Sequence, residues 1–138
     1  MNIEAFLLCD AATDSNGKLN VLGAFDTLFV ASVPAAHPQC AVALRLRLER
    51  SEQGEHHIAV HFVDEDGQHL VGPLEGKFRV AGQPGHSGGS NLILNLQGLQ
   101  LKRHGEIAIH LLIDGRHMAS LPLYVRKPPE MGPSARVS

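Results

Sequence analysis

Residues 107–126 read IAIHLLIDGRHMASLPLYVR and contain two runs in which apolar residues recur at every second position. Because successive side chains of a strand point to opposite faces, this period predicts two strands that each bury one face. The expected inward rows are Ile107, Ile109, Leu111 and Ile113 in the first run, and Ala119, Leu121, Leu123 and Val125 in the second. Asp114-Gly115 separates the runs and suits the positive φ angles of a tight turn. The stretch therefore predicts an antiparallel hairpin that covers a core.

The same alternation recurs upstream, over residues 41–49, 56–64, 74–80 and 91–96. Turn signals such as Asn16-Gly17 and Asp66-Gly67 separate the apolar runs at the spacing typical of an all-β domain. Residues 18–33 are long enough for one bent strand or two short ones, with Gly23 as a kink. We interpret residues 34–38 as a loop that crosses between strands, and residues 82–90 as a flexible interior loop.

These runs predict an all-β fold, namely an antiparallel β-sandwich of about seven to nine strands, immunoglobulin-like or jelly-roll-like. A closed β-barrel is the alternative, because turn spacing does not distinguish the two. We expect one domain over residues 1–127. Residues 128–138 have no periodic apolar face and are expected to form a flexible C-terminal tail.

Composition narrows the function classes. Of the 138 residues, 43% are hydrophobic and 19% are charged, which is typical of a soluble globular chain. The formal net charge of −2 gives no reason to expect nucleic-acid binding. No apolar run reaches transmembrane length and no secretion signal is evident, so we expect no membrane partner and a cytoplasmic location. Cys9 and Cys40 are then expected to be reduced thiols, with a disulfide between them as the alternative.

Residues 7–28 read LLCDAATDSNGKLNVLGAFDTL and resemble the start of an uncharacterised bacterial family. Members of that family open with a Leu-Leu-x-Asp-x-Ala strand followed by Gly-Lys-Leu-Asn-x-Leu-Gly. The turn at residues 64–67 and the closing hairpin at 112–125 are also similar, so the resemblance covers most of residues 3–127. It implies a bacterial origin and supports a β-sandwich. Because the family has no assigned activity, the resemblance transfers no functional residues.

Acidic and amide side chains gather around two turns: Asp10, Asp14, Asn16 and Asp26 at the first, and Asp64, Glu65 and Asp66 at the second. The segment from Asp14 to Gly17 imitates the start of an EF-hand loop. However, the twelfth position of that loop, which needs an acid, is Phe25. We therefore expect these side chains to cap turns rather than to bind calcium, and a calcium-responsive module is only a third option for the function.

The chain contains nine histidines: His37, His56, His57, His61, His69, His86, His104, His110 and His117. His57 and His61 share a strand face but lie about 13 Å apart, too far to bind one zinc ion. Only a cross-strand pair, for instance His61 with His110, could chelate. We expect solvated or hydrogen-bonded histidines and assign no metal ligand, no cofactor and no cofactor-binding residue.

Catalytic machinery is not evident in the sequence, which contains no Gly-x-Ser-x-Gly motif. Cys9 lies on an apolar strand face, where a thiol usually serves as inert packing, although a Cys9 nucleophile with a histidine base remains an alternative. Arg45 and Arg47 could join Lys77 and Arg79 in a basic stripe if their strands were neighbours, but we expect a solvated face. We therefore assign no catalytic residue.

The sequence does not reveal the function. The expectation is a non-catalytic binding or assembly module of a bacterial cytoplasmic protein. Its partner would be another protein or a second copy, for example in a homodimer formed through residues 3–12, which are apolar on both faces. We expect no nucleic-acid or membrane partner. The alternative is a small hydrolase or metal-dependent enzyme with its site in the loops at one end of the sandwich.

Overall fold

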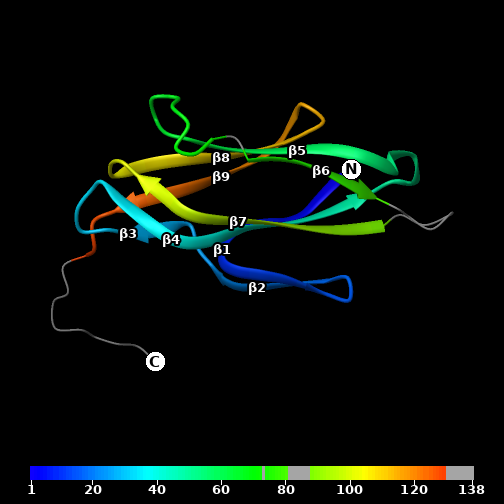
Figure 1. Cartoon of the computed structure of the whole chain (residues 1–138), viewed down its shortest axis with the longest axis horizontal. Coiled ribbons are helices and arrows are strands. Elements are labelled where there is room, and N and C mark those ends of the chain that lie inside the picture. Colours follow the sequence, from blue (N-terminus) through cyan, green and yellow to red (C-terminus); the bar gives the residue numbers. More distant parts are fainter. Residues whose placement is uncertain (73, 81–87, 130–138) are drawn as a thin grey trace.

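The computed structural model describes residues 1–72, 74–80 and 88–129. Within these residues, nine strands form two sheets that stack as a sandwich (Figure 1). Sheet A has the order β2-β1-β4-β7, with β1 (Asn2–Ser15), β2 (Lys18–Ala24), β4 (Ala35–Leu48) and β7 (Gly88–Leu101). Sheet B has the order β3-β9-β8-β5-β6, with β3 (Thr27–Phe29), β5 (Gly54–Val63), β6 (Leu74–Val80), β8 (Gly105–Ile113) and β9 (Arg116–Arg126). A 3-10 turn, η1 (Arg50–Glu52), follows β4.

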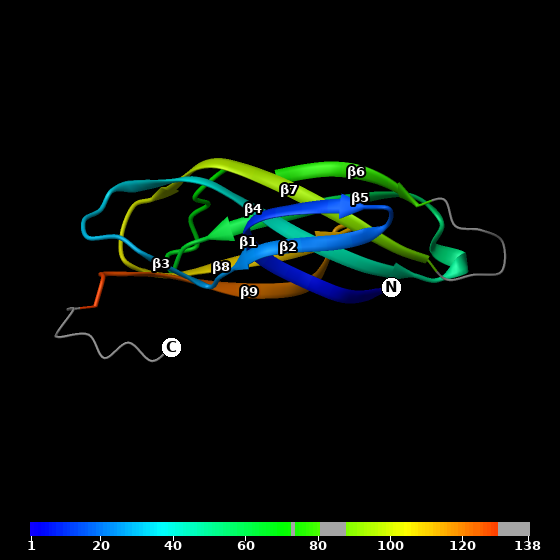
Figure 2. The ribbon, with the colours of Figure 1, turned by 90° about the horizontal axis from the view of Figure 1, so that it is seen from below.

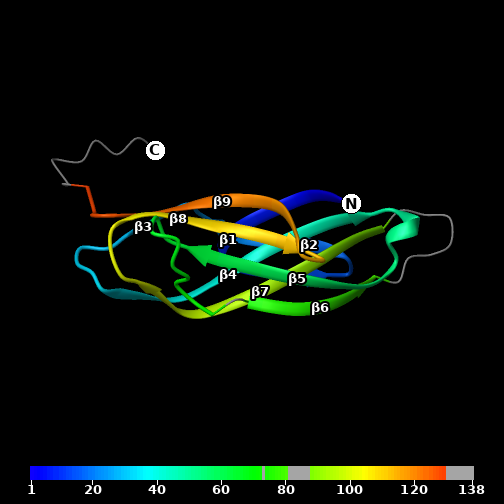
Figure 3. The same ribbon diagram turned by 90° about the horizontal axis from the view of Figure 1, so that it is seen from above.

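The predicted all-β sandwich is confirmed, with one difference in strand direction. Sheet A lies in front in one view (Figure 2) and sheet B in the opposite view (Figure 3), so the chain forms two layers rather than a closed barrel. β3 pairs with β9 in parallel, whereas the other strand pairs are antiparallel. Within the described residues, no helix is long and apolar enough to cross a bilayer.

The core consists of the inward rows of both sheets, which the sequence period predicts. Ile107, Ile109, Leu111 and Ile113 of β8 are all buried, as are Ile58, Val60 and Phe62 of β5. They pack against inward residues of β4 and β7. Phe62 and several aliphatic side chains are almost fully shielded from water, and each such side chain stabilises the fold by about 1.5–3 kcal/mol relative to an exposed position.

Sheet A curls at its first hairpin. β1 pairs with β4 through residues 2–9 and with β2 through residues 9–15, so the β1–β2 hairpin bends over the outer face of the sheet. A second, small core lies beneath it, with Cys9, Ala41 and Ala43 buried against Ala12, Leu19, Val21 and Ile93. Small side chains on the sheet let the hairpin approach closely, because an interior tolerates few voids and little excess volume.

Two boundary predictions were wrong. Residues 34–38 are not only a loop, since β4 begins at Ala35 and includes Pro38. The ladder with β1 ends at Ala41, so β4 has only β7 beside it around Pro38, and a strand with one free side tolerates proline. Of the predicted loop 82–90, residues 88–90 belong to β7 and residues 82–87 lie outside the described residues.

Glycines mark the places where strands bend or shift. Residues 18–33 form two short strands, as one of the two sequence interpretations predicts, and Gly23 near the end of β2 has φ +66°. In β7, Gly98 has φ +67°, and the buried positions change phase from Leu96 to Leu99 and Leu101. A shift of this kind is typical of a β-bulge, and it ends the simple alternation at residue 96.

The part of the predicted tail at residues 130–138 lies outside the described residues.

Both cysteines are free and buried. They lie on opposite faces of sheet A, because Cys40 belongs to the main core and Cys9 to the small outer core. The expected reduced thiols are therefore observed rather than the alternative disulfide. Burial raises the pKa of the Cys40 thiol to about 11.

Candidate functional site

An apolar groove runs along one side of the sandwich, between the edges of β1 and β9. Its volume is about 410 Å³, within the range of roughly 300–1,000 Å³ that is usual for binding pockets. It is lined by Leu7, Leu8, Ala24, Phe25, Asp26, Leu121 and Pro122. The lining is apolar apart from Asp26, whose carboxylate accepts a hydrogen bond from Thr27 Oγ1. The groove therefore suits an apolar or extended ligand more than a charged one.

Both strands that border the groove have a free edge. Residues 2–7 of β1 pair with β4 on one side, and no described strand pairs with them on the other. Residues 116–123 of β9 pair with β8 and likewise have no second described strand beside them. Leu8 O accepts a hydrogen bond from Phe25 N and so closes one end of the β1 edge. Free strand edges are sites where another chain can pair.

Exposed large apolar side chains of the described residues lie in the same part of the chain. They are Leu7 in β1, Leu22 in β2 and Phe29 in β3, with exposed fractions of 36%, 71% and 56%. Leu22 lines a second, smaller depression of about 280 Å³ on the β1–β2 hairpin. Of the three, only Leu7 lines the groove between β1 and β9.

Histidines form a row across the outer face of sheet B. His61 of β5 lies directly opposite His110 of β8, so the cross-strand neighbours that the sequence suggested are adjacent. The ring centroids of His61 and His69 are 5.2 Å apart. On the other side, His110 Nδ1 lies 3.2 Å from His117 Nε2, and Ser120 Oγ lies 2.8 Å from each of these two nitrogens.

A β-bulge in β9 brings His117 into this row. Residues 117 and 120 are three positions apart, so in a regular strand their side chains would point to opposite faces. The register shifts between Leu111 and Leu112, which pair with Ala119 and His117 and leave Met118 as the extra residue. Met118 and Ala119 both pack against the core, and His117 turns outward beside His110. A regular strand without the bulge would place His117 on the inward face, in phase with Ala119.

The environment of His110 favours its neutral form. Burial is the main cause of its lowered pKa, and the neighbouring His117 and His61 lower it further. Its neutral ring therefore carries one nitrogen that can accept a hydrogen bond or bind a metal. No group of three or more His, Cys, Asp or Glu side chains within the described ranges is placed to hold a metal ion.

His56 forms a different kind of site near the β8–β9 turn. Its Nδ1 lies 2.7 Å from Asp114 Oδ2, and its Nε2 donates to the backbone oxygen of Glu52. Both partners are hydrogen-bond acceptors, so this arrangement favours the doubly protonated form of the ring. The hydrogen bond to Asp114 raises the pKa of His56 and lowers that of Asp114. With both nitrogens engaged, this pair has no free acceptor to serve as a general base.

The remaining histidines occupy separate places. His104 Nε2 lies 2.9 Å from the backbone oxygen of Val30. His37 packs against the ring of Phe25, and its buried Nε2 has no hydrogen-bond partner within the described residues. His57 precedes His61 on the same face, and His86 lies outside the described residues.

The acidic residues of the second turn join a charged loop cluster at one end of the sandwich. The space between these loops is only about 60 Å³, well below the size of usual ligand pockets. Asp64 Oδ1 accepts from the amides of Asp66 and Gln68, and Arg103 pairs with Asp64 and Asp66. Glu65 accepts from the amide of Glu106. These side chains are therefore engaged with one another, in line with the turn-capping role that the sequence suggests.

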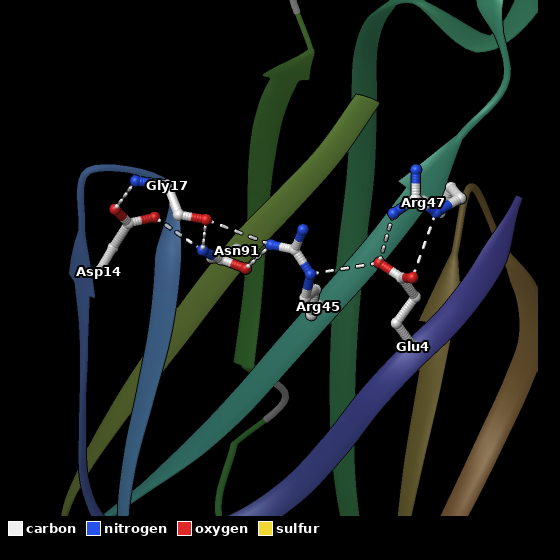
Figure 4. A network of polar contacts seen from close by, with 6 residues as sticks. All are labelled: Glu4, Asp14, Gly17, Arg45, Arg47 and Asn91. Carbon is white, nitrogen blue, oxygen red and sulfur yellow. Dashed lines mark hydrogen bonds and ion pairs between the residues drawn. The ribbon is translucent and has the colours of Figure 1, made fainter. Parts of the chain in front are cut away.

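Polar residues on the outer face of sheet A hold the first hairpin in place (Figure 4). Asp14 accepts from Gly17 N at 3.0 Å and from Asn91 Nδ2 at 2.9 Å. Arg45 Nη1 donates to Asn91 Oδ1 at 2.8 Å and to Gly17 O at 3.3 Å, and its Nε pairs with Glu4. These contacts tie the hairpin tip in β1 to β4 and β7, so Asp14 has a structural role.

Two further sequence candidates are not brought together. Arg45 and Arg47 lie on β4 in sheet A, whereas Lys77 and Arg79 lie on β6 in sheet B, so they form no common basic stripe. Cys9 is fully buried, burial raises the pKa of its thiol, and its Sγ lies 3.5 Å from Ala41 O. A raised pKa and lack of access are the opposite of what a nucleophilic thiol requires.

The geometry defines an all-β sandwich protein with an open apolar groove on one side and a histidine row on the outer face of sheet B. The chain belongs to DUF6941, a family of unknown function, whose model matches residues 4–126. The expected membership of a family without an assigned activity is therefore confirmed, while its bacterial origin stays a prediction.

Other comparisons add little. No curated protein matches the chain. Among solved structures, it is similar to Pseudomonas fluorescens alkylpurine DNA glycosylase AlkC bound to DNA containing an abasic site analog, with 10% sequence identity and a TM-score of 0.48. The match covers 90% of this chain but 30% of the glycosylase chain. A likeness this distant carries no argument about function.

Proposed function

We propose that the protein is a non-catalytic binding module that self-associates through the groove between β1 and β9. The observation that carries this proposal is the combination of an apolar groove of about 410 Å³ with two free strand edges along its sides. Backbone groups at a strand edge supply hydrogen bonds for an added strand, and apolar side chains beside them supply burial.

A second copy of the chain is the partner that this surface fits best. Most soluble homo-oligomers are closed and symmetric, and a two-fold axis places the same surface of both subunits in contact. An antiparallel pair of two β1 edges satisfies that symmetry, and it buries Leu7 of each copy. Leu7 is also an exposed large apolar side chain that lines the groove itself, so its burial would contribute to the stability of the dimer.

The enzyme alternative has no comparable support. The loops at one end of the sandwich enclose about 60 Å³, and their charged side chains pair with one another. We further propose a cytoplasmic location, supported by two buried free thiols, because reduced cysteines persist in a reducing compartment.

Sedimentation velocity of the full chain over a range of concentrations tests the proposal. We expect a reversible dimer, and Leu7→Asp should weaken it strongly because a charge would then be buried in the interface. Leu22→Asp is the matched control, since Leu22 is also an exposed leucine but lies outside the groove. A monomer at every concentration, or equal effects of the two substitutions, would rule out self-association through the groove.

A further inference from the structure

The outer face of sheet B holds three donor atoms in a compact triangle. Two of them belong to β9, the strand that also borders the groove, but the inference drawn from them does not rest on the function proposed for the groove. These atoms are His110 Nδ1, His117 Nε2 and Ser120 Oγ, with edges of 3.2, 2.8 and 2.8 Å. In the metal-free protein, the serine hydroxyl can donate to one ring and accept from the other, which holds both rings in this arrangement.

The triangle has the size of one face of a metal coordination tetrahedron. Ligand atoms about 2.0–2.1 Å from a tetrahedral zinc ion lie roughly 3.3 Å from one another. The two imidazole nitrogens are 3.2 Å apart, so they need to move little to bind the same ion. His57 and His61 cannot bind one ion in this way. Residues four positions apart on one strand lie about 13 Å apart, far more than the distance between two ligand atoms of the same ion.

The bulge in β9 is the second feature that points to a ligand. It interrupts the hairpin ladder at Met118 and thereby turns His117 from the inward face to the outer face, beside His110. Bulges are frequent next to functional sites, where they redirect a side chain. Pairing without the bulge would keep a regular ladder but would leave His110 without the second imidazole.

We propose that His110, His117 and Ser120 bind a divalent transition metal ion of the zinc class, with water completing the coordination. Imidazole nitrogen is a preferred ligand for zinc, copper and nickel. His117 and Ser120 are exposed and His110 is half-buried, so an ion can enter from solvent. A site of two imidazoles and one hydroxyl is compatible with the lack of any larger His, Cys, Asp or Glu group within the described residues.

The site has the character of a surface chelate rather than a closed structural zinc centre. Structural zinc sites use four cysteine or histidine ligands and supply much of the folding free energy. Here the main core consists of apolar side chains and does not include the triangle. Within the described residues, no carboxylate is hydrogen-bonded to the triangle to offset the charge of a divalent cation. We therefore expect reversible binding of one ion per chain and no change of fold.

The test uses the full chain without a histidine tag, titrated with Zn²⁺ in the presence of a chromophoric competing chelator. We expect saturation at one ion per chain. His110→Gln and His117→Gln should each weaken binding by at least about tenfold, the lower end of the loss seen even for groups that only support a ligand. Ser120→Ala should weaken binding less, because a neutral hydroxyl is a poorer ligand than imidazole.

His57→Gln is the matched control. His57, in β5, lies on the same outer face of sheet B as the triangle but does not belong to it. Co²⁺ gives an independent readout through the visible bands of tetrahedral coordination, and circular dichroism checks that each variant is folded. The proposal is overturned by the absence of saturable binding, by unchanged affinity in His110→Gln and His117→Gln, or by an equal loss in His57→Gln.

Discussion

The outer faces of the two sheets both carry polar clusters, but they differ in how far their hydrogen-bonding capacity is used. On sheet A, Arg45, Asn91 and Asp14 bond to one another and to the hairpin backbone (Figure 4). On sheet B, His110 and His117 share one hydroxyl between them. A cluster whose donors and acceptors are mutually engaged holds structure, whereas one with spare lone pairs is able to bind a ligand.

The same contrast holds between two histidines of sheet B. Both ring nitrogens of His56 lie beside hydrogen-bond acceptors, which favours its charged form. Burial and the neighbouring histidines instead lower the pKa of His110. Residue type alone does not decide which histidine is available to bind a ligand. The number of hydrogen-bond partners around each ring decides it.

The largest expected effect comes from filling the small core beneath the first hairpin. Ala43→Leu places three extra carbons where Ala43 is fully buried under β2, and overpacking of this kind costs about 1–3 kcal/mol. Ala108→Leu makes the same change on the outer face of sheet B, where Ala108 is only half-buried, and it should alter the free energy of unfolding by less than about 0.5 kcal/mol. Urea denaturation measures both changes in the free energy of unfolding. Equal effects would show that the hairpin does not pack tightly over the outer face of sheet A.

A smaller effect is expected from Arg45→Met, which keeps an apolar stem but leaves Asn91 Oδ1 and Gly17 O without this donor. The loss should be about 1 kcal/mol, since the Arg45 side chain is 30% exposed and water compensates in part. Arg47→Met should cost less than about 0.5 kcal/mol, because Glu4 is the one described side chain to which Arg47 donates hydrogen bonds and Arg47 is more exposed. Chemical denaturation distinguishes the two, and a larger loss in Arg47→Met would contradict the central role of Arg45.

The smallest effect concerns the pH dependence of stability. The pKa of His56 is raised above its ordinary value of 6.5 in the folded protein, so protonation favours folding. Its contribution is fully present below pH 6.5 and is lost as the pH rises through the raised pKa. We expect His56→Gln to flatten this decline, whereas His57→Gln should retain it. Melting temperatures between pH 5.5 and 8.5, a window of roughly one to two units either side of the ordinary pKa, provide the measurement.

The sequence predicts the regular parts of the fold well because a strand with one buried face leaves a period of two. β6 spans residues 74–80 as predicted, and the inward rows of β5 and β8 are the expected residues. Asn16-Gly17 and Asp114-Gly115 adopt positive φ angles, in agreement with their turn assignment.

The parts that sequence reasoning missed lie where a strand changes phase. Because of the shift at Gly98, the apolar alternation does not extend into the second half of β7. Because of the bulge at Met118, the alternation in β9 does not predict the face on which His117 lies. A bulge is decided by what the neighbouring strand and the core require, and those partners are distant in sequence. The candidate histidine site could thus be predicted only in part, as the pair of His61 and His110. The groove could not be predicted, because it depends on strand order.

The parallel pairing of β3 with β9 sets the order in which the molecule can be assembled during synthesis. The β1–β2 hairpin can form as soon as it leaves the ribosome, but Thr27 must wait for Tyr124, its partner in β9. Phe25, just before β3, and Leu121, in β9, both line the groove, although they are far apart in the sequence. The groove proposed for self-association is therefore completed only after β9 has emerged.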